Sequence, residues 1–422
     1  MLFIFCYSKM SSLHLKKLLF LLLGLPMLLC SSCYHHKHHS DIDIDNDHTL
    51  LIYMEADNNL SGYAASNIEA CIQGLLSSEN PINLVIYKDS KENGSNLPVL
   101  FQLKRNDTQR SKVDTIYLKQ WDKELNSSDP EVITDVINRT FSAFNTSVKG
   151  FEIWSHASSW LPSNNYSSTQ SRAGGPDKAM EYIGQDYSNY TELWEFRKAL
   201  ENADYALDYL LCDACHMATA EVLYEFRNVF QYILSAPSEI MGDGFPYYNI
   251  IHALGECHDP ESLPSALNLV FDCFQSKYAN NGTFSMLSTE GCEELLKECQ
   301  GLYAAANNCE AWDSSPRRYE QAIQHFGREY IATRYFFYDV KDWAEKVATL
   351  APDYDLQPLY DALEKCVVRS YASQNFTDGL ENLQISTCCG LALSVPNFWH
   401  LETYVSTSKF ESAYQQLQWN LK

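Results

Sequence analysis

Cys215 and His156 are of the residue types that could carry out nucleophilic chemistry together, and each lies just past an apolar run, residues 209–212 and 150–154 respectively. A thiolate is a strong nucleophile near neutral pH, and a nearby imidazole can accept its proton and later donate one to a leaving amine. The pair predicts a Cys-His dyad for acyl transfer. The backbone N–H groups of Cys215 and Ala157 are the natural donors to the oxyanion that develops in such a reaction.

Other interpretations of Cys215 stay open. A single cysteine is often a small buried hydrophobic residue, and a histidine at the end of a strand is often structural. Cys212 and Cys215 also form a C-x-x-C pattern, which is typical of a redox pair or of half a zinc site. Zinc would need a second pair at similar spacing, and none follows in the sequence. The redox interpretation is disfavoured because Cys212 ends an apolar strand and Cys215 opens a helix, so the two would lie in different environments. The dipole of this helix, expected over residues 218–230, would favour a thiolate at Cys215.

The elements that must position the two residues alternate between strands and helices. Apolar runs typical of strands occur at residues 50–54, 82–87, 150–154, 209–212 and 232–235, with helical patterns between them. This order predicts an α/β fold in which a mostly parallel sheet lies between two layers of helices. Because parallel strands end at the same edge of a sheet, His156 and Cys215 are expected to meet there.

Outside these runs, a hairpin at the sheet edge is predicted at residues 99–103 and 113–118, and Asp129 before Pro130 predicts the start of a helix. From residue 260 onward the pattern becomes helical, at residues 263–279, 290–306, 319–325, 340–350 and 356–372. A final pair of strands is predicted at residues 379–388 and 391–395. We therefore expect a core domain over residues 49–259 and a helical C-terminal region over residues 260–422 that returns to the sheet.

The N-terminal residues are typical of an export signal. Two lysines precede an apolar stretch at residues 18–29 that is too short for a membrane span, and Met10 is the more natural start. The stretch ends near Cys33, in a pattern resembling a bacterial lipobox, although Cys30 and simple signal cleavage remain alternatives. Residues 1–33 are thus predicted to be a lipoprotein signal peptide. Residues 34–48, rich in histidine and aspartate, are predicted to be a flexible polar tether rather than a metal site, because the spacing of a calcium loop is not met.

Composition limits the classes of function. The 422 residues are 45% hydrophobic, so the chain can bury a large core. The formal net charge of -23 argues against a nucleic-acid binder, which needs clustered basic residues. Of the fourteen cysteines, those at positions 6, 30 and 33 belong to the signal region or to the lipidation site, which leaves an odd number, eleven, in the body of the mature chain. An exported protein with an odd count keeps at least one free thiol unless it pairs between chains, and the disulfide pattern stays open.

The chain resembles the clostripain-like cysteine peptidases, relatives of gingipains and caspases, from about Leu50 to Trp399. The matching segments are residues 53–60, 153–156 with Trp160, 213–217, 221–227, 242–247 and 390–396. The resemblance implies a caspase-like α/β domain with added C-terminal helical elements, and it assigns the dyad to His156 and Cys215. It also implies a primary pocket for arginine or lysine in which Asp213 and Asp243 are the matching acidic positions. A buried substrate cation needs such a carboxylate partner.

Three features qualify what the resemblance implies. Where the family has glycine after the histidine and again just before the tryptophan, this chain has Ala157, Ser158 and Ser159; if the first position has positive φ, Ala157 is strained there. Some relatives cleave themselves in the loop between the dyad residues, and here Arg172 is the candidate site. A calcium requirement occurs in some relatives, but no ligand motif decides it here, so calcium stays open and no other cofactor is expected.

The resulting hypothesis is a cysteine endopeptidase that cleaves proteins or peptides after Arg or Lys through a Cys-His dyad and an acyl-enzyme. It would be exported, with a lipid anchor in the bacterial cell envelope, in the outer membrane, and would not bind nucleic acid. The competing hypothesis is a surface-binding lipoprotein that keeps the peptidase fold with weak or no activity, and residues 157–159 are the feature that favours it.

Overall fold

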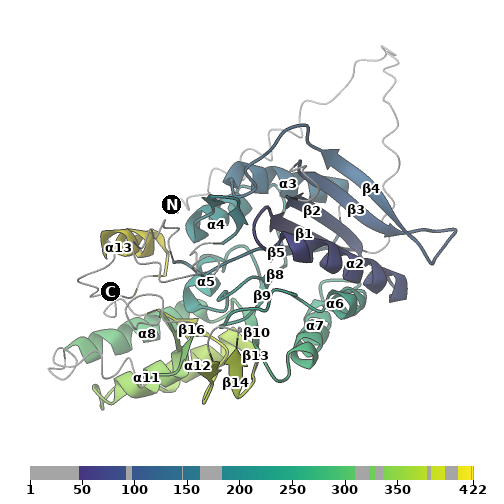
Figure 1. Cartoon of the computed structure of the whole chain (residues 1–422). Helices are drawn as coiled ribbons and strands as arrows, with labels where there is room; N and C mark the ends of the chain where they lie inside the picture. The colour runs from purple at the N-terminus through teal and green to yellow at the C-terminus, as the bar shows by residue number, and fades with distance from the viewer. Residues whose placement is uncertain are drawn as a thin grey trace, which may run out of the picture. The chain divides into compact units, whose positions relative to one another are not determined.

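A nine-stranded sheet runs through the chain, in the order β13-β10-β9-β8-β5-β1-β2-β3-β4 (Figure 1). Its five central strands are parallel to one another. They are β9 (Tyr232–Ser235), β8 (Tyr209–Asp213), β5 (Val148–Trp154), β1 (His48–Ala56) and β2 (Asn83–Ser90). The structure is a computed structural model that describes residues 47–91, 97–144, 146–161, 183–308, 323–327, 336–377, 382–394, 407–419 and 421, all within one unit that spans Asp43–Lys422.

Two layers of helices cover the sheet, as the alternation of side chains along β1 requires. Leu50, Ile52 and Met54 belong to the core shared with α2 (Ser61–Ser77), α6 (Tyr247–Leu254) and α7 (Leu263–Lys277). Tyr53, on the opposite face, stacks on Phe151, whose ring contacts Phe196 of α4. The second layer consists of α3 (Pro130–Ala143), α4 (Leu193–Glu201), α5 (Ala220–Glu225) and α8 (Cys292–Asn307) (Figure 1). The predicted three-layer α/β architecture is confirmed.

Several local predictions are also confirmed. The edge hairpin forms as β3 (Val99–Arg105) and β4 (Val113–Gln120), which are antiparallel to each other. Helix α3 begins at Pro130, and the Asp129 side chain caps it by accepting a hydrogen bond from the Glu131 N–H at 2.9 Å. This cap satisfies one of the N–H groups that a helix N-terminus leaves without a partner.

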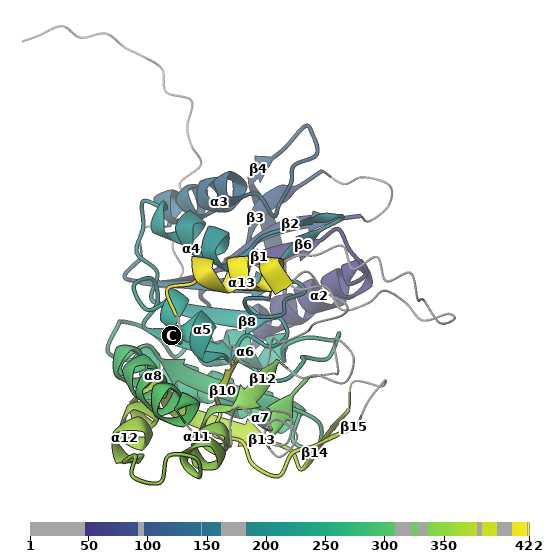
Figure 2. The ribbon, with the colours of Figure 1, turned by 90° about the vertical axis from the view of Figure 1, so that its left-hand side faces the viewer.

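The C-terminal region contributes two strands to the large sheet that the sequence did not predict. β10 (Thr283–Ser288) is antiparallel to β9, and β13 (Val367–Ala372) is antiparallel to β10. The predicted helix at residues 356–372 is therefore wrong in its second half, because α12 (Gln357–Cys366) ends where two consecutive valines begin β13. β-branched residues fit a pleated strand better than a helix. Figure 2 shows α8, α11 (Val340–Ala348) and α12 gathered beside β10 and β13.

Short strands form within both predicted ranges near the C-terminus, but their predicted pairing with each other is wrong. β14 (Asn375–Thr377) pairs with β15 (Asn382–Gln384), whereas β16 (Ala392–Leu393) pairs with β12 (Phe337–Asp339). The predicted helix at residues 319–325 is wrong over its described end, where β11 (His325–Phe326) pairs with β12. The structure of these short segments is determined by pairing with strands that are distant in the sequence. Two-residue strands such as β6 (Gln185–Asp186) and β7 (Asn189–Tyr190), and the terminal helix α13 (Thr407–Gln416), complete the described elements.

Several sequence predictions lie outside the described residues. They include the signal peptide with Cys33, nearly all of the tether, and Arg172 in the long loop. The boundary between residues 259 and 260 stays a prediction. Within the described part of the chain, the structure contains no helix with the length and apolar character needed to cross a membrane.

Candidate active site

The sheet brings His156 and Cys215 to the same edge. β5 and β8 are parallel neighbours, and Trp154 is the register partner of Asp213. The Ser155 N–H donates to the Asp213 carbonyl at 3.4 Å, so the pairing extends one residue past β5. His156 and Cys215 therefore occupy corresponding positions, each two residues beyond the last paired residues of adjacent strands. Such strands lie about 4.8 Å apart, so both residues follow the same carboxyl edge of the sheet.

Cys215 is half-buried, and its sulfur accepts a hydrogen bond from the Ile240 N–H at 3.3 Å. A backbone donor at this distance favours a negatively charged sulfur. The expected helix over residues 218–230 is shorter than predicted, because α5 covers only Ala220–Glu225 and has Thr219 as its N-cap. Cys215 thus precedes the cap by four residues, and the Ile240 N–H takes the place of the expected helix dipole.

His156 has a hydrogen-bond partner that orients its ring. Its Nε2 lies 2.5 Å from Oδ1 of Asn59, and its carbonyl accepts a hydrogen bond from the Gly184 N–H at 2.9 Å. Since an amide oxygen can only accept, Nε2 carries the proton and Nδ1 is left as the basic nitrogen. Burial lowers the pKa of His156 from 6.5 to about 4. The imidazole is therefore neutral near pH 7 and able to accept a proton from a thiol.

Backbone strain falls on Ser159 rather than on Ala157. Ser159 has φ of 61°, whereas Ala157 is not among the residues with positive φ and forms an antiparallel bridge with Ile183. The expected strain at Ala157 is thus corrected. Ser159 is buried, and its hydroxyl lies 2.6 Å from that of Thr219, which offsets part of the cost of a left-handed conformation in a residue other than glycine.

His216, next to the candidate nucleophile, is buried inside the protein. Its backbone has φ of 57°, its ring stacks on Phe337 with centroids 4.8 Å apart, and its Nδ1 lies 3.0 Å from the Pro237 carbonyl oxygen. Gly327, with φ of 93°, passes so close that an added Cβ would lie 2.8 Å from the His216 ring. The His216 ring is thus closely packed next to the turn that carries Cys215.

Asp213 is buried within a network of hydrogen bonds. Its Oδ2 accepts from the Phe245 N–H at 3.0 Å and from the Tyr247 hydroxyl at 2.7 Å, and the same hydroxyl contacts Glu152. One hydroxyl has one proton, so a second proton must reside on a carboxyl group. Burial raises the pKa of Glu152 well above its usual range and that of Asp213 to about 6. A protonated Glu152 donating to Tyr247, which in turn donates to an ionised Asp213, accounts for both contacts of the Tyr247 hydroxyl.

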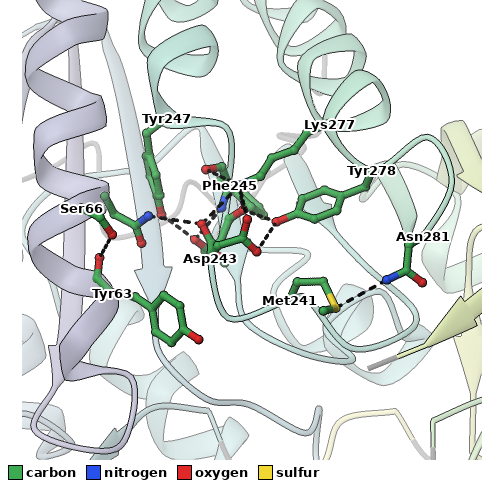
Figure 3. Close-up of polar contacts among 12 residues, drawn as sticks. Tyr63, Ser66, Met241, Asp243, Phe245, Tyr247, Lys277, Tyr278 and Asn281 are labelled. Carbon is green, nitrogen blue, oxygen red and sulfur yellow. Dashed lines mark hydrogen bonds and ion pairs between the residues drawn. The ribbon is translucent and has the colours of Figure 1, made fainter. Parts of the chain in front are cut away.

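Asp243 lies beside Asp213 but is more exposed. Its side chain is 63% exposed, and its Oδ2 forms an ion pair with Lys277 Nζ at 3.4 Å (Figure 3). Lys277 Nζ also donates to the carbonyl oxygens of Asp243 and Gly244, at 3.2 and 2.7 Å. Gly244 joins the two acidic positions, because with its φ of 63° an added Cβ would lie 2.4 Å from Asp213 Oδ2. The structure therefore brings Asp213 and Asp243 together, and it adds a lysine that the resemblance did not imply.

The C-x-x-C pattern does not form a redox pair in this structure. None of the ten described cysteines of the chain is in a disulfide, and Cys212 and Cys215 are both free thiols. Cys212 is wholly buried in β8, and burial raises its pKa well above the usual range. A thiol whose pKa is raised is a poor partner for disulfide exchange, because the thiolate is the reacting form.

Sequence reasoning missed four residues that shape the site: Asn59, Tyr247, Glu152 and Lys277. The first three lie inside or beside segments that match the family. Their positions could therefore have been identified from the sequence, although their contacts could not. Lys277 lies in α7, more than thirty residues after Asp243, and an ordinary lysine in the last turn of a helix gives no sign of such a contact.

Solved structures of known proteases have the same fold. An inactive zymogen C11 protease from Parabacteroides distasonis is 26% identical and has a TM-score of 0.70, and the match covers 90% of this chain and 98% of that chain. A secreted C11 cysteine protease from Bacteroides thetaiotaomicron, in complex with an irreversible peptide inhibitor, is 21% identical and has a TM-score of 0.66. That match covers 89% of this chain and 100% of the other. No curated protein matches the chain.

The predicted fold, a caspase-like α/β sandwich with a mostly parallel sheet, is thus the fold of C11 proteases. A model described as the clostripain family matches residues 52–421. That range contains every strand of the large sheet except the first four residues of β1, and it contains both residues of the predicted dyad. The chain belongs to the clostripain family of cysteine proteases.

Proposed function

We propose that this chain is a cysteine endopeptidase that hydrolyses peptide bonds after arginine or lysine. The observation that supports it most is the placement of His156 and Cys215 at corresponding positions past two adjacent parallel strands, in a chain of a cysteine protease family. The neutral state of His156 and the N–H donor at the Cys215 sulfur are both suited to forming a thiolate.

In the proposed mechanism, His156 Nδ1 takes the proton from Cys215, and the thiolate attacks the scissile carbonyl. The N–H groups of Cys215 and Ala157 stabilise the oxyanion of the tetrahedral intermediate. The intermediate collapses as His156 donates the proton to the leaving amine, which leaves an acyl group on the sulfur. Water, deprotonated by His156, then attacks the thioester, and the carboxylic acid product departs as Cys215 is restored.

The preference for a basic residue rests on the two acidic side chains beside the site. Asp213 carries hydrogen bonds that hold it in place, and Asp243 is exposed enough to meet a substrate cation. A guanidinium or ammonium group would have to share Asp243 with Lys277, so the proposed pocket contains two carboxylates and one cation of its own. A substrate cation would neutralise the excess negative charge of this pocket, whereas an acidic side chain would add to it.

The test is hydrolysis of fluorogenic peptides that carry Arg, Lys, Asp or Leu at the scissile position. We expect turnover of the Arg and Lys peptides by the wild type and none by Cys215→Ala. Cys273→Ala is the matched control, because Cys273 is a half-buried free thiol in α7 outside the dyad. Absence of Cys215-dependent turnover would remove the peptidase proposal, and turnover of the Asp peptide would remove the pocket assignment.

A second candidate function is a weakly active or inactive binding protein with the peptidase fold. The left-handed Ser159, two residues beyond Ala157, is the observation that favours it. If Ala157 is held in a position where its N–H misses the oxyanion, catalysis falls while substrate binding persists. Binding of an arginine-containing peptide aldehyde, with no turnover of any of the four substrates, would support this alternative.

We also propose that the chain is exported and anchored by a lipid on Cys33 in the bacterial envelope, in the outer membrane, which rests on the sequence alone. Radioactive palmitate should label the full chain in its host, and Cys33→Ala should lose the label. Cys30→Ala is the control, because Cys30 is the alternative acceptor. Labelling that survives Cys33→Ala but is lost in Cys30→Ala would move the anchor to Cys30.

A further inference from the structure

His216, the residue after the candidate nucleophile, has an unusual backbone conformation. Its φ of 57° is positive, a region that residues other than glycine rarely occupy. A histidine persists there only where the surrounding structure holds it, and such positions gather at functional sites. The side chain is also almost wholly buried, with 1% of its surface exposed. The contacts that hold His216 in this conformation are therefore informative about the site.

His216 contacts three consecutive residues of the segment 237–240, which follows β9. Its Nδ1 lies 3.0 Å from the Pro237 carbonyl oxygen, and its backbone N–H donates to the Ser238 carbonyl at 3.0 Å. Its Nε2 lies 4.0 Å from Oε1 of Glu239. Because a carbonyl oxygen can only accept a hydrogen bond, Nδ1 carries a proton in this contact. The imidazole is thus a hydrogen-bond donor to the segment, a role that an apolar side chain cannot fill.

The same segment supplies the hydrogen-bond donor to the Cys215 sulfur. The Ile240 N–H donates to Sγ at 3.3 Å, and Sγ lies 3.8 Å from the Ile240 carbonyl oxygen. Earlier in the segment, Ser238 is anchored to β10 by the Thr283 hydroxyl, which lies 3.1 Å from the Ser238 nitrogen and 2.7 Å from the Ser238 hydroxyl. Ile240 lies two residues past this anchor, so the position of its N–H depends on how residues 237–239 are held.

The His216 ring is in turn held by the small sheet β11-β12-β16. It stacks on Phe337 of β12 with centroids 4.8 Å apart and an interplanar angle of 22°, and Gly327, which follows β11, passes close to it. β16 pairs with the chain just past the nucleophile, where the Ala392 N–H donates to the Ala218 carbonyl at 3.0 Å. The small sheet thus contacts both the ring and the turn that follows the nucleophile.

We propose that His216 is a positioning residue for Cys215. Through its Nδ1–H it holds Pro237 and the residues that follow, so that the Ile240 N–H stays directed at the sulfur and stabilises the thiolate. Hydrogen bonds to an ionised partner are stronger than those between neutral groups, so the position of this donor affects how readily the thiol ionises. The proposal rests on the proposed role of Cys215 as the nucleophile. The competing account, in which the ring only fills space, predicts that an aromatic side chain without a donor would serve as well.

Alkylation of Cys215 by iodoacetamide provides the test, because its rate follows the thiolate fraction and needs no peptidase turnover. The rate is measured on the full mature chain across the pH range in which a thiol titrates, and mass spectrometry of the modified peptide assigns it to Cys215. His216→Phe keeps a ring that can stack on Phe337 but has no donor. We expect it to lower the rate at pH 7 about tenfold and to raise the apparent pKa of the thiol by about one unit. For the arginine peptide, kcat should fall with KM little changed.

Two further variants assign the effect to the contacts of His216. His216→Asn places an amide N–H where Nδ1 lies and tolerates positive φ, so its rate should stay within about threefold of the wild type. Phe337→Leu removes the stacked ring and should lower the rate about three- to fivefold, because the imidazole is then held less firmly. His252→Phe, at an exposed histidine in α6, is the matched control and should leave the rate unchanged.

The outcomes separate this proposal from the peptidase function. Equal rates in the wild type and His216→Phe, or a rate in His216→Asn as low as in His216→Phe, overturn the role of His216. Thermal unfolding checks that each variant is folded; if His216→Phe is not, the comparison of Phe337→Leu with the wild type decides, and equal rates there overturn the proposal. Absence of turnover of every peptide, together with the expected pattern of alkylation rates, would remove the peptidase function and leave the role of His216 in place.

Discussion

Lys277 Nζ lies 3.4 Å from the Asp243 carboxylate, so the acidic position expected to bind a basic substrate already has a cation of the chain's own. Lys277 also donates to the carbonyl oxygens of the turn that carries Asp243. The lysine can thus act in two ways: it neutralises the carboxylate and it supports the turn. These roles have opposite effects on substrate binding, and a substitution separates them.

Replacing Lys277 with methionine is expected to lower KM for an arginine peptide about two- to fivefold, with kcat little changed. The reason is that an exposed ion pair contributes on the order of 0.2 to 1 kcal/mol, which the substrate cation no longer has to displace. Steady-state kinetics at low ionic strength would measure it. Lys277→Arg should behave like the wild type, and Lys297→Met, at a lysine that is 82% exposed, should change nothing. A rise in KM would show that support of the turn is the larger effect.

The low pKa of His156 predicts an enzyme that stays active in mild acid. With the pKa lowered to about 4 by burial, the imidazole remains a base at pH 5, where an ordinary histidine is protonated. The acidic limb of kcat/KM should therefore fall near pH 4 rather than near pH 6.5. Asn59→Leu removes the partner of the ring and should lower kcat about tenfold with KM little changed. A limb centred near pH 6.5 would contradict the neutral state of His156.

Unfolding must be monitored in the same experiment, because another histidine titrates in that range. Burial lowers the pKa of His48 to about 4, and its ring lies 2.8 Å from the Tyr209 hydroxyl. For both histidines the unfolded chain binds protons more tightly than the folded chain. Stability should therefore fall as the pH decreases from about 6.5 to about 4. Circular dichroism at each pH separates this loss from titration of the active site.

Glu221→Gln is expected to stabilise the protein at pH 8 and to leave it unchanged at pH 5. Glu221 is wholly buried, its Oε1 accepts from the Ser394 N–H at 2.7 Å, and burial raises its pKa to about 8. When the pKa of a carboxyl is higher in the folded state, the protein loses stability as the pH rises from the unfolded pKa to the folded pKa. The loss is about 1.4 kcal/mol per pH unit. Gln keeps the acceptor and cannot ionise. Urea unfolding at both pH values would measure the difference, and Glu293→Gln should show none.

Two glycine substitutions test where the strain lies. Ala157→Gly should destabilise the protein by roughly 0.5 to 1 kcal/mol without raising kcat, because the position has no left-handed conformation to relieve. Ser159→Gly relieves strain of about 1 to 2 kcal/mol but loses the contact with Thr219, worth about 1 kcal/mol, so its stability should be equal or slightly higher. Thermal unfolding and peptide kinetics give both values. A gain in kcat from Ala157→Gly would show that Ala157 is the strained residue.

Self-cleavage after Arg172 stays a prediction from the sequence. Intact mass spectrometry of the purified wild type should show two fragments, and Cys215→Ala should remain one chain. Arg172→Gln should abolish the cut in an otherwise active enzyme, as judged by the arginine peptide. Wild type and Cys215→Ala that both stay intact would remove the prediction.

The sequence was informative where a single local pattern determines the structure. Apolar runs predicted the parallel strands, and Asp129 before Pro130 predicted a helix start, because both follow from short-range chemistry. β10 and β13 were missed because their burial depends on pairing with strands distant in the chain. A wholly buried serine at residue 285 fits such a strand only when its partners are known.

The same distinction between local and long-range determinants applies to the candidate active site. The positions of Cys215 and His156 follow from strand order, so they could be predicted, whereas their contacts with Ile240 and Asn59 depend on how loops pack. The strain expected at Ala157 was assigned by analogy with a glycine, and the backbone places it two residues later at Ser159. Lys277 illustrates the limit most clearly, because only the packing of α7 against the 242–247 turn brings it to Asp243.

The pairing of β5 with β8 has a consequence for a nicked protein. Residues 155–208, which include Arg172, connect these two strands in sequence, yet each strand is buried in the middle of the sheet and also pairs with another neighbour, β5 with β1 and β8 with β9. A break between them severs the covalent chain without removing any of these ladders. The two fragments should therefore co-migrate as one particle in gel filtration and separate only in denaturant, with the nucleophile on one polypeptide and its base on the other.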